Sequence, residues 1–530
     1  MRYRGRSMQF SNAARLLAAA CLVAWPSAAI AETPDRLVLA IGGEPSEGYD
    51  PLLGWGRYGH PLFQSTLLSR NNALETVPDL ATDWSLSEDR LIWTIRIRPD
   101  ARFSDGTPLT AADVAFTFTE AARAGGALDL SVFVSAEALD DETLTITLSR
   151  PWITFTESFY TLGIVPAASY GPGYARNPVG SGPYRLVSWS EGEQLIVSRN
   201  PHYHGTTPAF ETLVFLFTDE STSLAAARAG QVDLVAVPAA LADAVPTGFT
   251  RHAVPSVDNR GITFPMQPPG ETTAEGAPVG NPVTSDRAIR QAINLGVDRD
   301  ILVDIALGGN GRPAQGPADG LPWSNPDAAL PFDPEAAIAR LDEAGWIPAS
   351  DGIRMREGVR AEFPLNYPSS DSTRQMLALT VAELLLPLGI EATPRGISWD
   401  QITRIMHAEP VLFGWGSHSP LEIYSLYASA WAGVEYFNAG HFRSEDVDAH
   451  LDAAQAAESL EASYPHWQAA EWDGETGFGP RGEAGWAWLV NLDHVYFADA
   501  CLDLGTPQIE PHGHGWPITA NLAQWRWTCD

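Results

Sequence analysis

Residues 78–118 read PDLATDWSLSEDRLIWTIRIRPDARFSDGTPLTAADVAFTF, and this stretch decides the fold that we expect for the chain. Apolar side chains alternate along its middle, at Leu91, Trp93, Ile95 and Ile97. That period of two is typical of a strand that packs mainly on one face. Residues 103–108 then form a turn from residue types that tolerate tight backbone geometry. Thr110 offers an N-cap and Asp113 stands at the third helical position, so the spacing predicts a helix from there onward.

As a literal string, the stretch resembles the signature of the family 5 extracellular solute-binding proteins, the peptide- and nickel-binding receptors of ABC importers. The shared pieces are the Asp-Leu-Ala-x-x-Trp turn at 79–84, the Phe-Ser-Asp-Gly-x-Pro turn at 103–108 and the Ala-x-Asp-Val helix start at 111–114. The hairpin that opens with Gly-Ser-Gly-Pro-Tyr at 180–184 is similar to another family motif. The resemblance covers essentially the whole chain after its first 31 residues. It implies an α/β fold of two lobes with mixed sheets, hinged around a central cleft.

The first 31 residues have the pattern of a secretory signal peptide. Four arginines precede any acidic residue, an apolar run follows at 13–23, and Ala29-Ile30-Ala31 forms an A-x-A cleavage site. We therefore expect cleavage after Ala31 and a periplasmic protein. Ala18 stands where a lipoprotein signal carries Leu, which argues against lipidation of Cys21.

Composition excludes several classes of function. The formal net charge is −32, and such a surface repels nucleic acid and anionic lipid. The chain has no G-x-S-x-G elbow, H-E-x-x-H pair or P-loop, so we do not expect an enzyme. Cys501 and Cys529 remain after signal cleavage, and in an oxidising compartment they predict one disulfide.

The chain is expected to divide at the Pro/Gly/Thr-rich segment 267–284. We assign residues 1–31 to the signal peptide, 32–275 and 491–530 to a first lobe, and 276–490 to a second lobe. We expect a helical run through Leu67 after Trp55, Arg57, Tyr58 and His60, and we expect Ser285 to cap the first helix of the second lobe.

Four histidines are candidate metal ligands. His418 follows a strand end, in a stretch where peptide-binding members of the family carry an Asp that pairs with the peptide ammonium. A neutral imidazole suits a borderline metal better than an amine. His512 and His514 alternate with glycines in a loop that can turn both rings to one point, and His60 lies in the segment that lines the cleft in the family. The alternatives are a loop histidine satisfied by backbone and a solvated surface turn.

Arg374 and Arg260 are candidates for holding the carboxylates of a metal chelator. Arg374 lies where a strand ends and a helix begins, so the helix N-terminus would assist. A plain salt bridge is the alternative for each, and for Arg260 it is the favoured one. Tyr58, Trp415 and Trp516 are the aromatic residues expected to contact the ligand.

These observations predict a receptor that captures Ni(II) as its transported ligand, chelated by histidine or a metallophore, with no tightly bound cofactor. Three imidazoles seldom complete a nickel shell, so a chelator would supply the rest. The resemblance implies an ABC permease as partner, and we expect the receptor to be a monomer. An oligopeptide ligand remains the alternative.

Overall fold

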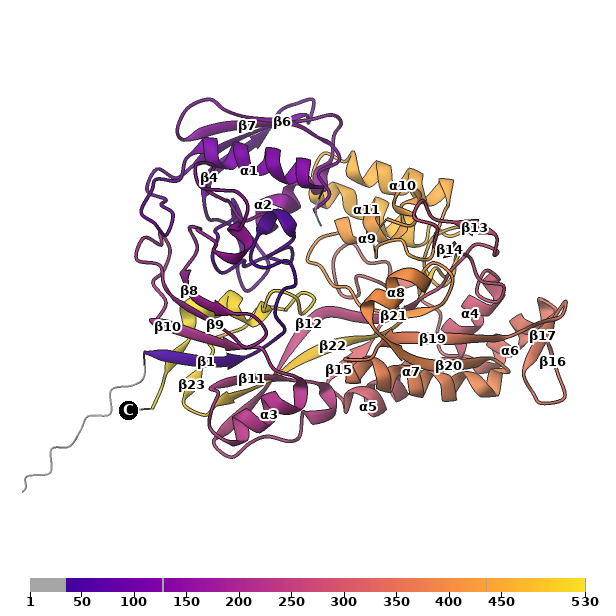
Figure 1. The fold of residues 1–530 in the computed structure, drawn as a ribbon. Coiled ribbons are helices and arrows are strands. Elements are labelled where there is room, and N and C mark those ends of the chain that lie inside the picture. Colours follow the sequence, from indigo (N-terminus) through magenta and orange to yellow (C-terminus); the bar gives the residue numbers. More distant parts are fainter. Residues whose placement is uncertain (1–34, 126–127, 435, 530) are drawn as a thin grey trace, which may run out of the picture. The chain divides into compact units, whose positions relative to one another are not determined.

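The computed structural model describes residues 35–125, 128–434 and 436–529 (Figure 1). The expected signal peptide, with Cys21 and the cleavage site at Ala31, lies outside the described residues. No helix within the described part is long and apolar enough to cross a membrane.

The opening stretch forms the predicted strand, turn and helix. Strand β5 (Ile92–Ile97) buries Trp93, Ile95 and Ile97 and exposes the residues between them. Helix α1 (Ala111–Ala124) begins after Thr110, whose backbone N–H donates to the Asp113 carboxylate at 2.9 Å. This pairing is half of a capping box, which satisfies backbone donors at the helix start. The strand and the helix predicted from the sequence are therefore confirmed.

Strand β5 belongs to an antiparallel sheet of four strands in the order β4-β5-β7-β6, on which α1 packs (Figure 1). The other three strands are β4 (Ala81–Leu86), β6 (Phe133–Ala138) and β7 (Thr143–Leu148). Alternate residues of β7 are buried, as its period of two requires.

The main sheet has eleven strands, and it is mixed. Its order is β20-β19-β21-β12-β22-β11-β1-β10-β9-β8, with β15 also paired to β22. Strand β1 pairs in parallel with β10 and β11, whereas β12 and β22 run antiparallel. The strands are β1 (Arg36–Ala40), β8 (Tyr184–Ser190), β9 (Gln194–Arg199), β10 (Thr212–Leu216), β11 (Leu234–Val237), β12 (Phe249–Thr263), β15 (Gly311–Pro313), β19 (Glu362–Pro368), β20 (Glu391–Ile397), β21 (Val411–Phe413) and β22 (Trp486–Asp499).

Helices cover this sheet and pair with one another. Helix α7 (Ser372–Leu385) packs on β19 and β20 and contacts α5 (Arg299–Leu307), while α4 (Arg287–Gly296) packs on α6 (Pro334–Glu343). Helices α10 (Glu445–Gln455) and α11 (Leu460–Glu471) form another pair (Figure 1). The remaining helices are α2 (Glu157–Thr161), α3 (Glu220–Arg228), α8 (Trp399–Ile405) and α9 (Leu421–Tyr427).

Small two- and three-stranded sheets complete the described part. They are formed by β2 (Leu68–Arg70) with β3 (Thr76–Pro78), β13 (Glu271–Thr272) with β14 (Pro278–Val279), β16 (Ile347–Pro348) with β17 (Arg354–Arg356) and β18 (Val359–Arg360), and β23 (Leu502–Asp503) with β24 (Arg526–Trp527). The predicted disulfide joins Cys501 and Cys529 beside the last of these sheets.

Two local expectations are wrong. The segment before Leu67 is not helical, because the indole N–H of Trp55 donates to the Pro61 carbonyl at 2.6 Å and Leu62 adopts a positive φ of 59°. These features turn the chain away from a helical path. Helix α4 is capped by Asp286 rather than Ser285, since the Asp286 carboxylate accepts the backbone N–H of Ala288 at 2.8 Å.

Candidate functional site

The site lies where the two longest strands of the main sheet cross the molecule. Strands β12 and β22 pair along most of their lengths, but their register breaks between Pro255 and Asn259. The C-terminal segment fills this break, because Val257 N–H donates to the Glu510 carbonyl and Glu510 N–H donates to the Pro255 carbonyl, both at 2.9 Å. Two residues on, His512 N–H donates to the carbonyl of Gly416 at 2.8 Å, in the loop after β21. The break therefore brings together β12, the C-terminal segment and the loop after β21.

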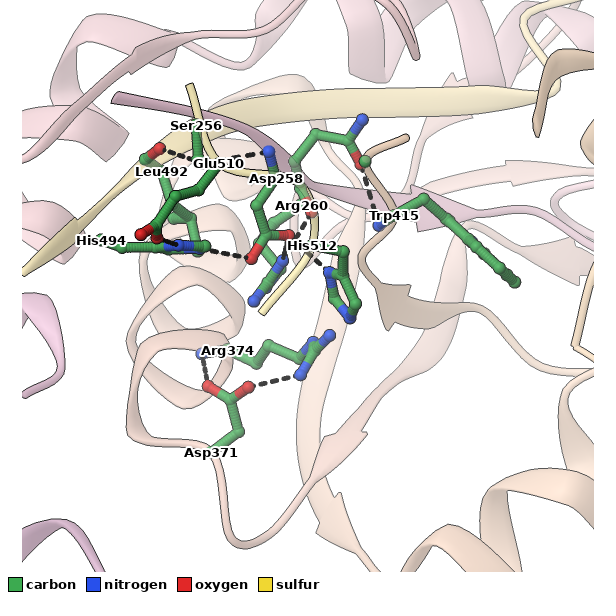
Figure 2. Close-up of polar contacts among 12 residues, drawn as sticks. Ser256, Asp258, Arg260, Asp371, Arg374, Trp415, Leu492, His494, Glu510 and His512 are labelled. Atoms are coloured by element: carbon green, nitrogen blue, oxygen red, sulfur yellow. Dashed lines mark hydrogen bonds and ion pairs between the residues drawn. The ribbon is translucent and has the colours of Figure 1, made fainter. Parts of the chain in front are cut away.

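Asp258 lies in the break and is the centre of a buried polar network (Figure 2). One carboxylate oxygen pairs with the guanidinium of Arg260 and accepts from His512 Nδ1 at 2.6 Å, and the other faces His494 Nε2 at 3.0 Å. Burial would raise the pKa of Asp258, but the charge of Arg260 and the bonds from both histidines hold that pKa well below its usual range. Asp258 is therefore an ionised acceptor.

His494 is held between two carboxylates. Its Nδ1 lies 2.5 Å from Glu510 Oε2, an oxygen that also accepts the hydroxyl of Tyr496 at 2.8 Å. Burial would lower the pKa of His494, but hydrogen bonds to Asp258 and Glu510 outweigh it and raise that pKa to about 10. Both ring nitrogens donate, so the ring is an imidazolium.

The partners of His512 and His514 give the two rings opposite tautomers. Because the Asp258 carboxylate only accepts, His512 carries a proton on Nδ1. Burial lowers the pKa of His512, so the ring is neutral and its Nε2 carries a lone pair. His514 Nδ1 lies 3.0 Å from Arg57 Nη2. A guanidinium only donates, so His514 accepts at Nδ1 and keeps its proton on Nε2. The ring centroids lie 4.7 Å apart at an interplanar angle of 62°, so two neighbouring rings supply one acceptor and one donor.

Two buried guanidiniums stand next to these histidines. Arg374 lies in the first turn of α7, whose N-cap Asp371 accepts its backbone N–H at 2.8 Å and pairs with its guanidinium. Burial and the nearby charge of Arg260 lower the pKa of Arg374 to about 10, against the opposing effect of Asp371. Among the described residues, neither Arg260 Nε nor Arg374 Nε has a hydrogen-bond partner. A guanidinium can hold a carboxylate through two parallel bonds, but both Nε atoms are buried, so a ligand reaches them only if the surrounding side chains move.

The walls beside this network are aromatic. The ring of Tyr58 lies 5.6 Å from that of His512, and Trp399 lies 5.9 Å from the Arg374 guanidinium carbon. A cavity of about 510 Å³ lies next to the network and is lined among others by Arg57, Tyr58, Trp399 and His514, whereas His512, Arg260 and Arg374 are not among its lining residues. Its size suits a small solute.

His60 and His418 line a different cavity, of about 180 Å³, and Tyr58 belongs to the walls of both. His60 Nε2 contacts Gln508 Nε2 at 3.1 Å, and His418 Nε2 is buried with no partner among the described residues. Burial lowers the pKa of His60 to about 4 and that of His418 to about 3, so both rings are neutral. The described residues contain no group of three or more His, Cys, Asp or Glu side chains arranged for a metal ion.

The two candidate tryptophans have different surroundings. Trp415 is buried and stacks on Phe437, with ring centroids 5.1 Å apart. Trp516 borders the larger cavity but is 2 % exposed and stacks on Phe215 at 4.2 Å, so most of its surface packs in the core.

Sequence reasoning missed Asp258, His494, Glu510 and Arg57. Asp258 and Arg260 share one face of a strand by their spacing, and this pair of charges within an otherwise buried segment was a usable signal. His494 and Glu510 carry no comparable signal, since only the fold brings them to Asp258.

The sequence matches a known protein family. Residues 75–433 match the model of the bacterial extracellular solute-binding proteins, family 5. The chain belongs to this family. Family 5 proteins are the solute-binding receptors of ABC importers, work with membrane permeases and bind peptides, chelates or other solutes.

Relatives and solved structures agree with the family. Protein XP55 of Streptomyces lividans is 34 % identical over 499 residues, covering 90 % of this chain and 88 % of that protein. The probable D,D-dipeptide-binding periplasmic protein DdpA of Escherichia coli is 27 % identical over 71 % of this chain and 73 % of its own. NikZ of Campylobacter jejuni, solved with Ni(L-His), superposes with a TM-score of 0.80 at 22 % identity, covering 93 % of this chain and 99 % of that one. The fold is thus the two-lobed periplasmic binding protein fold, with mixed sheets around a central cleft.

Proposed function

We propose that this family 5 receptor captures Ni(II) as a carboxylate-bearing chelate, with histidine or a metallophore as chelator, and delivers it to an ABC permease. One observation carries the proposal: His512 keeps a lone pair on Nε2, its ring lies within the electrostatic influence of the Arg260 and Arg374 guanidiniums, and neither Nε atom has a partner among the described residues. A metal ion requires the lone pair, and the chelator's carboxylates require the guanidiniums.

Each side chain then has a distinct task. His512 ligates the metal, with Asp258 behind it in the arrangement that raises the basicity of a ligating imidazole. His514 donates from Nε2 to a chelator oxygen, next to the arginines. Tyr58 and Trp399 border the chelate and exclude water from it.

The chelator is essential to this proposal. Nickel prefers four to six donors, and the described residues contain no ready group of three. Because His60 and His418 lie along the neighbouring cavity, we keep them as candidate ligands that reach the metal only if the chelate extends past Tyr58.

A short peptide is the second candidate, and one observation favours it. Glu422 follows the loop where peptide-binding members carry their acidic residue, and its Oε2 accepts the Gly416 N–H at 3.1 Å. Burial raises the pKa of Glu422 to about 8. An ammonium group bound there would restore the carboxylate, while Arg374 would hold the peptide's carboxylate.

Calorimetry with nickel–histidine and with di- to pentapeptides tests the proposal. At 100-fold excess over Kd, a bound ligand stabilises the fold by about 2.7 kcal/mol, and we expect this shift with nickel–histidine. His512→Ala should abolish most of the binding, whereas His202→Ala, in an exposed loop, should leave it unchanged. Unchanged nickel–histidine binding by His512→Ala, or a shift with peptides alone, would overturn the nickel assignment.

We propose that the chain is exported, cleaved after Ala31 and monomeric in the periplasm, in keeping with relatives named as periplasmic proteins. We also retain the division into residues 32–275 with 491–530 and residues 276–490.

A further inference from the structure

His494 contacts two carboxylates that come from different parts of the chain. It lies on β22, Asp258 lies on β12, and Glu510 lies in the C-terminal segment that also carries His512 (Figure 2). The ring spans the network from one acid to the other, with Nε2 on Asp258 and Nδ1 on Glu510. Asp258 bonds to the rings of both His494 and His512, so the most direct chain of hydrogen bonds from His494 to His512 runs through Asp258.

The position of Asp258 depends on its cationic partners. Its backbone N–H donates to Ser256 Oγ at 3.0 Å, and the Ser256 hydroxyl donates to the Leu492 carbonyl at 2.6 Å, so the main chain is fixed on one side. The carboxylate is fixed by Arg260 on one oxygen and by His494 on the other. Without the imidazolium, the negative charges of Asp258 and Glu510 would face each other across a buried space, and like charges repel strongly there.

We propose that His494 is a positioning residue for ligand capture: its imidazolium holds Asp258 against His512 and thereby fixes the His512 tautomer that offers Nε2 to the ligand. The direction of a ring nitrogen's lone pair is set by the hydrogen bond that the other nitrogen makes. If Asp258 moves away, His512 Nδ1 loses its acceptor and the proton is free to occupy either nitrogen. The affinity of the site for a metal or for any hydrogen-bond donor then falls, although no ligand-contacting residue has changed.

The first test needs no ligand, so it stands apart from the nickel assignment. In ligand-free protein with ¹⁵N-labelled histidine, NMR should show His494 protonated on both nitrogens and His512 protonated on Nδ1 alone. In His494→Gln, which keeps an amide donor but loses the charge, the His512 signals should show both tautomers. A His494 ring with a bare nitrogen in the wild type, or an unchanged His512 tautomer in the variant, would refute the proposal.

A double variant separates positioning from space filling. If repulsion from Glu510 displaces Asp258 in His494→Gln, then adding Glu510→Gln removes that repulsion and should return His512 to its Nδ1-protonated form. Should the double variant show the same mixture as the single one, His494 acts only by filling space. Where His494→Gln does not fold, the wild-type NMR spectrum alone still decides whether the imidazolium and the fixed tautomer exist.

The consequence for binding rests on the proposed function and is measured separately. With nickel–histidine as the probe, loss of a partner behind a ligating histidine typically weakens metal affinity about 10- to 100-fold, and we expect such a loss in His494→Gln with partial recovery in the double variant. If the wild-type protein fails to bind nickel–histidine, the nickel assignment falls, while the NMR result still decides the role of His494. If His494→Gln shows both His512 tautomers but binds nickel–histidine with the affinity of the wild type, the tautomer does not govern capture, and the proposal is overturned.

Discussion

Asp258 Oδ1 lies 2.6 Å from His512 Nδ1, although 254 residues separate the two in the sequence. This one hydrogen bond joins the strand that crosses the main sheet to the C-terminal loop, and it decides which nitrogen of His512 is free. The ligand site and the crossing strands are therefore parts of one polar network.

Arg374→Ala should weaken nickel–histidine binding by about 1.5–3 kcal/mol, because a hydrogen bond to a charged group is lost. Binding of the bare nickel ion should change far less, since the proposed partner of Arg374 is the chelator's carboxylate. Arg404→Ala, at an exposed position of α8, serves as the control. Calorimetry with both probes measures the difference, and equal losses for the two probes would contradict the assigned role.

Replacing Cys501 and Cys529 together by Ser should lower the free energy of unfolding by roughly 3–4 kcal/mol, because the bond closes a loop of 28 residues in the unfolded chain. Urea denaturation of the oxidised protein and of the double variant gives the difference. Reduction of the wild-type protein should lower its free energy of unfolding by a similar amount. If alkylation of the oxidised protein labels two free thiols, the disulfide is refuted.

Gly180→Ala should destabilise the fold strongly, by about 1–3 kcal/mol or more, because overpacking forces the backbone apart. A Cβ at this position would stand 2.1 Å from the Phe63 carbonyl oxygen. Gly171→Ala is the matched control, since a Cβ there meets nothing within 4 Å. Thermal melting of the two variants should separate them clearly, and similar melting temperatures would argue against the close packing of this motif.

His441 should make stability fall as the pH drops from about 6.5 toward 4. Burial and the charges of His407 and Arg443 lower the pKa of His441 to about 4, below the value of about 6.5 in an unfolded chain. The unfolded state therefore binds the extra proton first, and the stabilisation present above pH 6.5 is lost on acidification. His441→Asn tolerates the local φ of 54° and should show a flatter pH profile of unfolding free energy. The exposed His202→Asn is the control and should keep the pH profile of the wild type. If His441→Asn shows that same profile, His441 is not the source of the pH dependence.

The mature chain should begin at Glu32, since the A-x-A site ends at Ala31. Mass spectrometry of protein recovered from the periplasm measures the N-terminus directly. A retained N-terminus, or a lipid-modified Cys21, would contradict the assignment.

The sequence by itself determined much of the fold, because local patterns carry it. The alternation at Trp93, Ile95 and Ile97 and the capping pair Thr110–Asp113 each act within a few residues, so they predict the strand and helix that form. The Cys501–Cys529 bond also follows from the sequence, because only two cysteines remain after the expected signal cleavage. The helix expected before Leu67 does not form, because the local Trp55–Pro61 hydrogen bond turns the chain and the Phe63 carbonyl accepts the backbone N–H of the distant Gly182 at 2.8 Å.

Only the tertiary structure decided how the candidate site is assembled. The sequence marked His60, His418 and His514 as candidate ligands, but it gave no reason to expect that His514 lines one cavity while His60 and His418 line another. Nor did it identify His494 or Glu510, because a charge in a buried segment acquires its partners only when the register break of β12 brings the C-terminal segment to Asp258. The tautomers of His512 and His514 follow from those partners, so the chemistry offered to the ligand is a property of the folded chain.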